Sequence, residues 1–367
     1  MSVLIFFIVL FALILVHEWG HFIAAKKTGM RVDEFGIGFP PKLFSRVWGE
    51  TEYSFNALPI GGFVRIYGEN AADAAADGAA GGDISRSFTS KPAWAQAIVL
   101  VAGVTMNVLF AWLLFTIALS VGAPTAVDEA SAGSDAQLMV QSVLPDGPAA
   151  TAGIPHGAVI TKLSVAGEML PTLTPQTFRT ATEMNAGIPL TITYTTGGET
   201  RVVEVVPETG IAAGDSERAV VGVQLALVET VREPFYKAIY HGGMQTVSML
   251  RAITVGIATL IADSVKGTAD FSSVTGPVGI VGMVGDAAAF GIVPLLLFTA
   301  MISLNLAVIN LLPFPALDGG RLVFVAIESV IRRPINPVWV ARLNALGFVL
   351  LMTLMVAVTY KDIVVRL

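Results

Sequence analysis

The 367-residue sequence contains no cysteine, so disulfide frameworks, iron–sulfur clusters and thiolate metal sites are all excluded. Charge is scarce as well, since only 14% of the residues are charged, against about 25% in a typical soluble domain. A basic surplus is also missing, and the net charge of −6 argues against nucleic acid as a partner. What the chain has instead is 54% hydrophobic residues, which indicates a membrane protein.

Four segments supply the roughly 20 mostly apolar residues that a helix needs to cross a bilayer core about 30 Å thick. The first of them ends in Lys26-Lys27 and lacks both a basic start and an A-x-A-like site, so we interpret it as a retained span and not as a signal peptide. The sequence therefore predicts a multi-pass α-helical membrane protein with transmembrane helices at about residues 2–25, 94–122, 291–312 and 338–359.

The distribution of basic residues predicts the orientation of these spans. Lysine and arginine gather in the connection between the first and second spans and in that between the third and fourth, as they do in cytoplasmic loops. The N-terminus, residues 123–290 and the C-terminal tail are then expected to be extracytoplasmic. Lys361 and Arg366 in the tail oppose this orientation but are outnumbered.

A fifth apolar segment, residues 235–262, is expected to lie on the membrane and not to cross it. Its uncharged run from Ala252 to Ala262 has only 11 residues, which is too short for a span. Apolar residues recur in the segment at spacings of three and four, as in an amphipathic helix at the outer surface of a bilayer. A helix packed within a domain is the alternative.

Residues 31–67 consist of short β-type runs broken by glycine and proline, with strands expected at Phe35–Phe39, Glu52–Leu58 and Phe63–Tyr67. A β-rich loop this apolar is expected to contact either membrane or protein; the family resemblance described below implies a membrane-associated β-hairpin. The Ala, Gly and Asp residues of 70–83 are typical of a flexible connector, which we extend to residue 90.

Residues 126–229 have the mixed polarity of an ordinary folded domain. They contain a helix-like segment at Pro175–Met184 among five strand-like segments, which predicts a small α+β domain. The order of these elements, and the turn Pro145–Pro148 followed by a short helix that ends at Gly153, resemble a PDZ domain of the bacterial, permuted type. Such a domain binds an extended peptide or a chain terminus at a sheet edge; an unrelated α+β module is the alternative. The expected strands are Met139–Leu144, Val159–Val165, Leu190–Thr195, Thr200–Val206 and Val220–Val228.

The PDZ-like domain is thus predicted to be an extracytoplasmic insertion between two membrane parts. The first membrane part covers residues 1–125 and the second covers 291–367. A surface helix and linker occupy 230–290, after the domain at 126–229.

The motif His17-Glu18-Trp19-Gly20-His21 carries the chemistry. Two imidazoles at positions i and i+4 lie on one face of a helix, close enough to bind a single zinc ion. Glu18 can accept a proton from a water at that metal, as general base and later general acid. A random chain of this composition would contain such a motif only about 0.002 times. The alternative, two histidines that snorkel to the membrane interface, leaves Glu18 without a role.

A catalytic zinc normally takes three protein ligands, and the third must come from elsewhere in the chain. His156 and His241 are expected on the outer side of the membrane, away from His17 and His21. Asp318 follows the third span, which runs inward like the first, so it is expected at a similar depth and is the predicted third ligand.

Two prolines, Pro313 and Pro315, interrupt the helix before Asp318, and two glycines after it free the backbone, so the carboxylate can turn inward. A turn that only ends the helix at the interface is the alternative for this residue. Asn305 and Asn310 are polar groups in the apolar third span, and either hydrogen-bonds substrate backbone or bonds between helices.

Together these residues resemble the site-2 protease family of intramembrane zinc metalloproteases, and more narrowly the bacterial regulator of sigma E protease group. The resemblance extends over nearly the whole chain. The matching segments are H-E-W-G-H at 17–21, E-F-G-I-G-F at 34–39, N-A-L-P-I-G-G-F-V at 56–64, the Gly103/Asn107 pair, T-G-P-V-G-I at 275–280 and N-L-L-P-F-P-A-L-D-G-G at 310–320.

The resemblance implies that His17, His21 and Asp318 ligate Zn²⁺, that Glu18 is catalytic and that Asn310 contacts substrate. It implies an enzyme of the bacterial cytoplasmic (inner) membrane, with its active site near the cytoplasmic side. Its substrates would be single-pass transmembrane proteins, such as anti-sigma factors or remnant signal peptides, cut within their membrane segments during regulated intramembrane proteolysis.

The resemblance further implies that the loop at 31–67 enters the lipid bilayer and holds an unwound substrate helix as an added strand. The PDZ domain would filter substrates by the size of their extracytoplasmic part. Two features depart from the family pattern. Only one PDZ domain fits within 126–229, where some relatives carry two, and Val104 stands where relatives commonly have proline.

Two functions compete with intramembrane proteolysis. A membrane-bound metalloprotease that cuts soluble chains usually has its H-E-x-x-H motif outside the apolar span, whereas here the apolar run Phe6–Val16 leads directly into the motif. A catalytically silent PDZ scaffold has no need of the intact motif or of Asp318. A transporter is disfavoured because the sequence has no internal repeat.

Overall fold

The computed structural model describes residues 1–69, 83–130, 132–145, 147–211, 218–268 and 275–366. Most of the predicted connector at 70–83 therefore lies outside the described residues, as does Asp146 of the predicted turn. The chain divides into two compact units. The helical unit comprises Met1–Ala118 and Phe235–Leu367, and the inserted unit comprises Leu119–Pro234.

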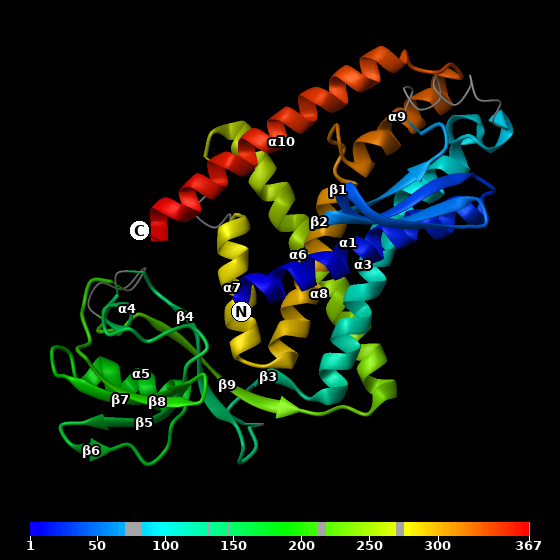
Figure 1. Ribbon diagram of the computed structural model, residues 1–367. Helices are drawn as coiled ribbons and strands as arrows, with labels where there is room; N and C mark the ends of the chain where they lie inside the picture. The colour runs from blue at the N-terminus through cyan, green and yellow to red at the C-terminus, as the bar shows by residue number, and fades with distance from the viewer. Residues whose placement is uncertain (70–82, 131, 146, 212–217, 269–274, 367) are drawn as a thin grey trace. The chain divides into compact units, whose positions relative to one another are not determined.

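Five helices of the described chain are long and apolar enough to cross a membrane (Figure 1). Four coincide with the predicted spans, and the fifth is the segment that we expected at the membrane surface. Two shorter helices were not anticipated by the sequence. The long helices are α1 (Ser2–Lys27), α3 (Ala93–Val121), α6 (Phe235–Lys266), α8 (Ile292–Leu311) and α10 (Pro337–Arg366), and the short ones are α7 (Pro277–Ala289) and α9 (Asp318–Ile331).

Helices α1, α3 and α8 form the centre of the helical unit. The start of α1 lies beside α7, as shown by the contact of Ser2 with Gly285. Helix α7 is followed directly by α8. The other end of α1 reaches Asp318, just after α8, so α1 and α8 run in the same sense. Apolar residues of both helices share one cluster, which contains Leu13 and Leu306. Helix α3 runs the opposite way, since it passes Gly20 before it passes His17.

Helix α6 packs across α3 and α8, and Figure 1 shows it crossing α8. The indole of Trp112 donates a hydrogen bond to the carbonyl of Ile239, at 2.8 Å. Gly242 lets the two backbones approach, because a Cβ there would lie 3.1 Å from the nitrogen of Thr116. The opposite side of α6 is exposed and carries large apolar residues such as Met244.

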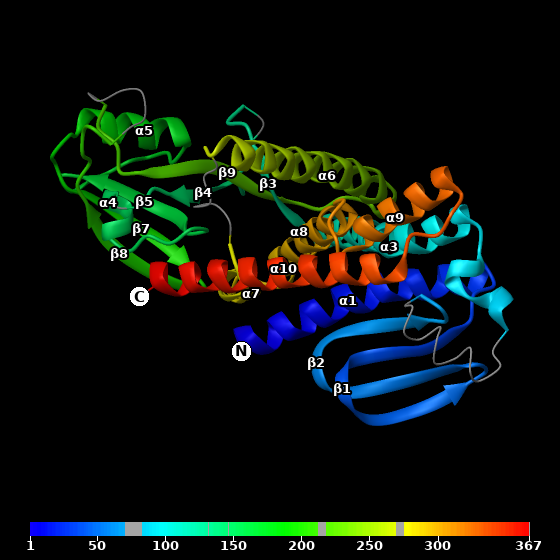
Figure 2. The same ribbon diagram turned by 90° about the horizontal axis from the view of Figure 1, so that it is seen from above.

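The predicted β-loop forms two long antiparallel strands, β1 (Val32–Trp48) and β2 (Thr51–Ile66), which fold back on each other and are called the hairpin below. Residues 34–37 of β1 pair with 62–65 on one side and with 52–55 on the other, so the three predicted strand segments lie side by side within it. The pairing shifts register between Phe39 and Lys42, and this irregularity accommodates the two prolines between them without ending the strand. The hairpin lies along the C-terminal part of α1 (Figure 2), where Phe35 and Phe22 make an edge-to-face ring contact with centroids 5.4 Å apart.

The end of the predicted connector is ordered where the structure describes it. It forms two short 3₁₀ helices, η1 (Ile84–Arg86) and η2 (Phe88–Ser90). Phe88 is buried in a cluster with residues of α1 and α3, so an apolar side chain anchors this segment. An ion-pair network attaches it to the hairpin, because Glu50 accepts from Arg86 at 2.6 Å and from Lys26 at 2.7 Å.

The inserted unit contains a sheet with the strand order β3-β9-β4-β5-β7-β8, and β6 pairs with β5. All five predicted strands and the predicted helix are present. The first strand, β3, and the two-residue β6 were not predicted. The elements are β3 (Ala123–Val127), β4 (Gln137–Val143), α4 (Pro148–Thr151), β5 (Val159–Val165), β6 (Glu168–Met169), α5 (Pro175–Met184), β7 (Leu190–Thr196), β8 (Glu199–Val205) and β9 (Val223–Val231).

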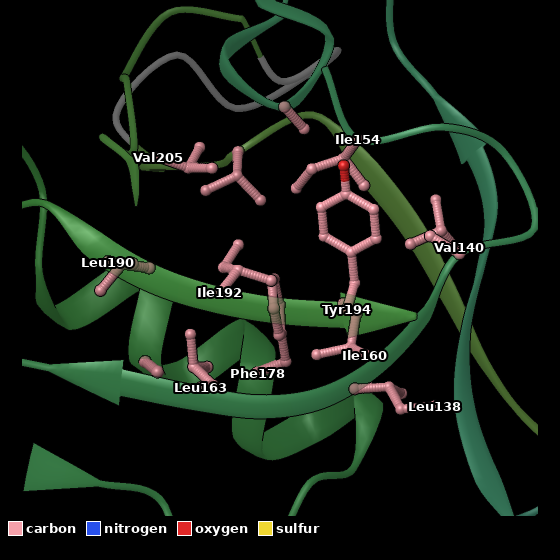
Figure 3. Packing of buried hydrophobic residues seen from close by; sticks show 14 of the residues in the cluster. Leu138, Val140, Ile154, Ile160, Leu163, Phe178, Leu190, Ile192, Tyr194 and Val205 are labelled. Atoms are coloured by element: carbon pink, nitrogen blue, oxygen red, sulfur yellow. The ribbon is translucent and has the colours of Figure 1, made fainter. Parts of the chain in front are cut away.

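Alternating burial along β7 builds the core of the inserted unit, because successive side chains of a strand point to opposite faces. Leu190, Ile192 and Tyr194 point inward and pack with Phe178 of α5 (Figure 3). The hydroxyl of Tyr194 has a hydrogen-bond partner, because it donates to the carbonyl of Gly153 at 3.1 Å.

Candidate metal centre

Two imidazoles and one carboxylate meet near the C-terminal end of α1. His17 and His21 project from the same face of the helix, and their Nε2 atoms are 3.1 Å apart. The Oδ2 atom of Asp318 lies 3.1 Å from His17 Nε2 and 3.3 Å from His21 Nε2. The structure therefore brings together three predicted residues that are separated by up to 301 positions in sequence.

The chain turns tightly between α8 and α9 to deliver Asp318. Helix α8 ends at Leu311 because prolines 313 and 315 cannot continue it, and Asp318 begins α9. A Cβ on Gly319 or Gly320 would collide with backbone carbonyls of this turn, so both positions require glycine. The turn is held from outside by Asn344 of α10, whose side chain accepts from the nitrogen of Ala316 at 3.2 Å.

Helix α3 supports the two imidazoles from the other side. His21 Nδ1 donates to the carbonyl of Val99 at 2.8 Å, and the side chain of Asn107 lies 3.3 Å from His17 Nδ1. Between these two contacts, Gly103 leaves room for the rings, because a Cβ there would lie 2.8 Å from His17 Cε1 and would collide with His21. The imidazoles are thus held in a cradle that a larger residue would fill.

The charge state of Asp318 follows from the same contacts. Burial by itself would raise the pKa of this carboxyl, but its close contacts with His17 and His21 outweigh the effect of burial, and the pKa of Asp318 lies below its ordinary value. The carboxylate is therefore anionic at neutral pH. Three residues further along α9, Arg321 forms an ion pair with Glu69, which follows β2 by three residues, and this pair ties α9 to the segment after the hairpin.

A cavity of about 230 Å³ opens beside the cluster. His17, Glu18 and Asp318 line it together with Asn310 of α8. Glu18 also lines a narrow space against Gly36 and other residues of the hairpin, so this carboxyl lies between the cluster and the β-structure.

The second predicted asparagine, Asn305, is not among the residues that line the cavity. Its amide donates to the carbonyl of Met301 in its own helix, at 2.9 Å. Three residues that support the imidazoles, Val99, Gly103 and Asn107, were not predicted from the sequence to have this role. Gly103 and Asn107 do belong to the family-like motif of α3, whereas a backbone carbonyl such as that of Val99 leaves no signal in a sequence.

The donor set fits a zinc ion. Two imidazole nitrogens and one carboxylate oxygen lie within 4.8 Å of one another. Such N₂O sets, with one position left for water or substrate, are typical of catalytic zinc sites. The adjacent cavity provides space on the open side, and Gly103 leaves room for both rings beside α3.

Comparison with known proteins gives a consistent result. The profile of Peptidase family M50 matches residues 5–354. A Clostridium perfringens protein named as a candidate zinc metalloprotease is 37% identical over 353 residues, which covers 96% of each chain. Zinc metalloprotease RasP of Geobacillus kaustophilus is 30% identical and covers 99% of this chain and 97% of its own. The regulator of sigma-W protease RasP of Bacillus subtilis is 28% identical over 99% of this chain and 98% of its own.

One solved structure also matches part of the chain. The PDZ domain of an SdrC-like protein from Listeria monocytogenes is 22% identical, with a TM-score of 0.21. The match covers 26% of this chain and 92% of that domain.

Proposed function

Because this chain belongs to peptidase family M50 and is a zinc metalloprotease of the site-2 protease type, we propose that it hydrolyses peptide bonds within the membrane segments of other proteins. One observation carries the proposal: His17, His21 and Asp318 converge beside Glu18, at a cavity enclosed by helices apolar enough to span a membrane.

The three converging residues would hold the metal, through Nε2 of each histidine and a carboxylate oxygen of Asp318. A zinc ion bound there supplies a Lewis acid that polarises a peptide carbonyl and lowers the pKa of water. The chain's own contribution is to fix the three donors. Asp318 is held by the tight turn after α8, and the imidazoles are held by α1 and by their contacts with α3.

Glu18 is the proposed general base. It neighbours His17 in sequence and lines the same cavity, where it can take a proton from water and return it to the leaving amine. Asn310 also lines the cavity, and its amide can donate to a substrate carbonyl. No cavity contact supports a substrate-binding role for Asn305, whose amide is engaged within α8.

A transmembrane helix must unwind before it can be cut, because its peptide groups are hydrogen-bonded within the helix. The hairpin offers replacement partners, since the described β1 and β2 form a two-stranded sheet and pair only with each other. A substrate segment added along this sheet would keep its backbone hydrogen-bonded in lipid. Glu18 lies against the hairpin near Gly62, with its Cγ 3.6 Å from where a Cβ of this glycine would be.

Four spans are proposed, with α6 on the extracytoplasmic surface. The parallel arrangement of α1 and α8 supports this number, because the chain between α3 and α8 must begin and end on the same side of the membrane. If α6 alone crossed, α8 would run the wrong way, and α7, with 13 residues, is too short for a second crossing.

The cysteine-free chain permits a clean test of this topology. Single cysteines at Tyr236 and Ser264, near the two ends of α6 and both exposed, should react with an impermeant maleimide from the same side of the membrane. Labelling from opposite sides would refute the four-span arrangement.

The proposed setting is the bacterial cytoplasmic membrane, with the N-terminus and the inserted unit outside and the metal centre near the cytoplasmic face. Single-pass proteins such as anti-sigma factors or signal-peptide remnants are the proposed substrates, and the name of the Bacillus subtilis relative, a regulator of sigma-W protease, is consistent with that class. The inserted unit is proposed to act as a PDZ domain that binds peptides or chain termini. Between α5 and residues 220–225 it contains a groove of about 720 Å³, which is the proposed peptide-binding site.

The deciding experiment compares wild type with Glu18→Gln in proteoliposomes that contain a single-pass helical substrate. Cleavage should fall by about 10²- to 10⁴-fold, the usual contribution of a general base, while the bound zinc stays at one ion per chain. Glu168→Gln, an exposed position of β6, is the matched control and should cleave normally. Unchanged processing by Glu18→Gln would end the enzyme assignment for this site.

The same preparation distinguishes the competing protease. An enzyme that cuts soluble chains would hydrolyse an unstructured water-soluble peptide at least as fast as the membrane helix. We expect the helix to be the better substrate, with the cut inside its apolar segment as identified by mass spectrometry of the products.

A further inference from the structure

The two imidazoles of the metal centre use their nitrogens in the same way. In both His17 and His21, Nε2 faces Asp318, and Nδ1 faces α3. An imidazole that binds a metal through Nε2 carries its hydrogen on Nδ1, and that hydrogen needs an acceptor. For His21 the acceptor is a backbone carbonyl, that of Val99 at 2.8 Å, which can only accept.

The corresponding neighbour of His17 is the side-chain amide of Asn107, whose Nδ2 lies 3.3 Å from His17 Nδ1 in the structure. Asn107 is completely buried, and its backbone carbonyl is already engaged by the hydroxyl of Ser303 at 2.8 Å. An amide can present either its oxygen or its nitrogen to a neighbour, and the hydrogen-bond network assigns which one. In the orientation of the structure, Oδ1 has no partner among the described residues. Turning the amide by 180° would place Nδ2 at that unpartnered position instead, so the number of hydrogen bonds does not decide between the two orientations. The hydrogen on His17 Nδ1 decides the orientation of the Asn107 amide, because only Oδ1 can accept that hydrogen.

We infer that Asn107 is a positioning residue of the metal centre, whose Oδ1 accepts the Nδ1–H of His17 and thereby keeps Nε2 directed at the metal. The inference rests on the proposed ligand set of His17, His21 and Asp318. It makes the two histidines equivalent: each is fixed on the metal-binding tautomer by one acceptor of α3, a carbonyl for His21 and a side-chain amide for His17. Ser303 of α8 holds the backbone at Asn107, so three helices orient a single ring.

Two substitutions separate acceptance from donation at this position. Asn107→Asp keeps an oxygen that can accept the hydrogen of His17, whereas Asn107→Leu has a similar size and neither donates nor accepts. If Asn107 instead donated a hydrogen bond to His17, the carboxylate of Asn107→Asp could not replace that bond, and this variant would lose the contact as Asn107→Leu does.

The experiment measures the zinc dissociation constant of the detergent-solubilised full chain by competition with a chromogenic chelator, for wild type and each variant. Loss of such an outer hydrogen bond typically weakens metal binding 10- to 100-fold, so we expect Asn107→Leu to fall in that range. Asn107→Asp should stay within about threefold of wild type. Gln96→Leu, which removes another buried amide of α3 that donates to the carbonyl of Lys91, is the control and should bind zinc normally.

Two results would overturn the inference: wild-type zinc affinity in Asn107→Leu, or a loss in Asn107→Asp as large as that in Asn107→Leu. If the leucine variant does not fold, the aspartate variant decides alone, because it retains zinc only if Asn107 accepts. The variant His21→Ala tests the proposed zinc ligands independently of Asn107. If this variant binds zinc as tightly as wild type, the ligand set is wrong; if it loses zinc while Asn107→Leu does not, only the role of Asn107 fails.

Discussion

The glycine cradle of α3 allows the metal centre to be tested without touching any of its ligands. In Gly103→Ala, the added methyl group would lie 2.8 Å from His17 Cε1 and 2.8 Å from His21 Cε1. Ordinary contact begins near 3.4 Å, so both rings must retreat by about 0.6 Å, and His21 by more. Metal–ligand distances tolerate only about 0.2 Å. The required displacement is therefore several times what the ligand geometry permits.

The rings of Gly103→Ala have no easy direction of retreat. Tilting His21 would stretch its hydrogen bond to the carbonyl of Val99, and tilting His17 would break its contact with Asn107. Separating α1 from α3 would open the close approach at Gly20, where even a Cβ would collide with the carbonyl of Ala102. Overpacking of this kind costs about 1–3 kcal/mol of stability. Misplacement of catalytic groups by about 1 Å costs about 10²-fold in rate.

We therefore expect Gly103→Ala to lower zinc affinity at least about tenfold and kcat/KM for a membrane-helix substrate about 10²-fold. Chelator competition and proteoliposome cleavage measure the two effects. The control is Gly256→Ala in α6, where an added Cβ meets nothing within 4 Å. This change should leave zinc affinity and cleavage unaltered and, by restricting the unfolded chain, is expected to stabilise slightly. If Gly103→Ala binds zinc and cleaves like wild type, the idea that this glycine sets the imidazole positions is refuted.

Other predictions concern the metal, the hairpin and the inserted unit. Dialysis against a strong chelator should abolish cleavage of a membrane helix, and equimolar Zn²⁺ should restore it; activity that survives in metal-free protein would argue against a metal-dependent reaction. Hydrogen bonds from Arg86 and Lys26 lower the pKa of Glu50 to about 2, so its stabilising contribution is complete above the unfolded value near 4.3 and is lost only as pH falls toward 2. Protease resistance of the hairpin should thus be flat from pH 7 to 5 and lower at neutral pH in Glu50→Gln, with an effect below about 1 kcal/mol because the pair is partly exposed. Leu163→Ala removes a fully buried side chain and should destabilise the inserted unit by about 2–5 kcal/mol. Trypsin should then cut the variant faster than wild type within residues 119–234. Met169→Ala, at an exposed position, is the control and should be digested by trypsin at the wild-type rate.

The family and the chemistry could be predicted from the sequence because both are carried by local patterns. The spacing of His17 and His21 places them on one helical face whatever surrounds the helix, and the apolar runs mark the long helices by length alone. The resemblance to the site-2 proteases, drawn from these motifs, is confirmed by the family match over residues 5–354. In the inserted unit, alternation of apolar and polar residues gave the five strands, since a half-buried strand has a period of two.

Several features depended on contacts that no local pattern contains. Helices α7 and α9 are short and contain glycines, so no local pattern marks them; α7 packs against α1, and Val325 of α9 is buried in a cluster with Ala24 of α1 and Val99 of α3. Strand β1 continues through a pair of prolines because its partner strand shifts register there. A propensity-based prediction ends the strand at the prolines, since it cannot know that a partner is present.

The sequence alone thus determined the inventory of this protein: long apolar helices, a hairpin, a small α+β unit and a set of zinc-type donors. Tertiary structure decided how the donors are held. The acceptor for His21 is a backbone carbonyl 78 residues away in sequence. Both imidazole rings fit beside α3 because residue 103 is glycine and has no side chain. Neither has a sequence signature of its own, because a carbonyl belongs to every residue and a glycine acquires meaning only from what packs against it.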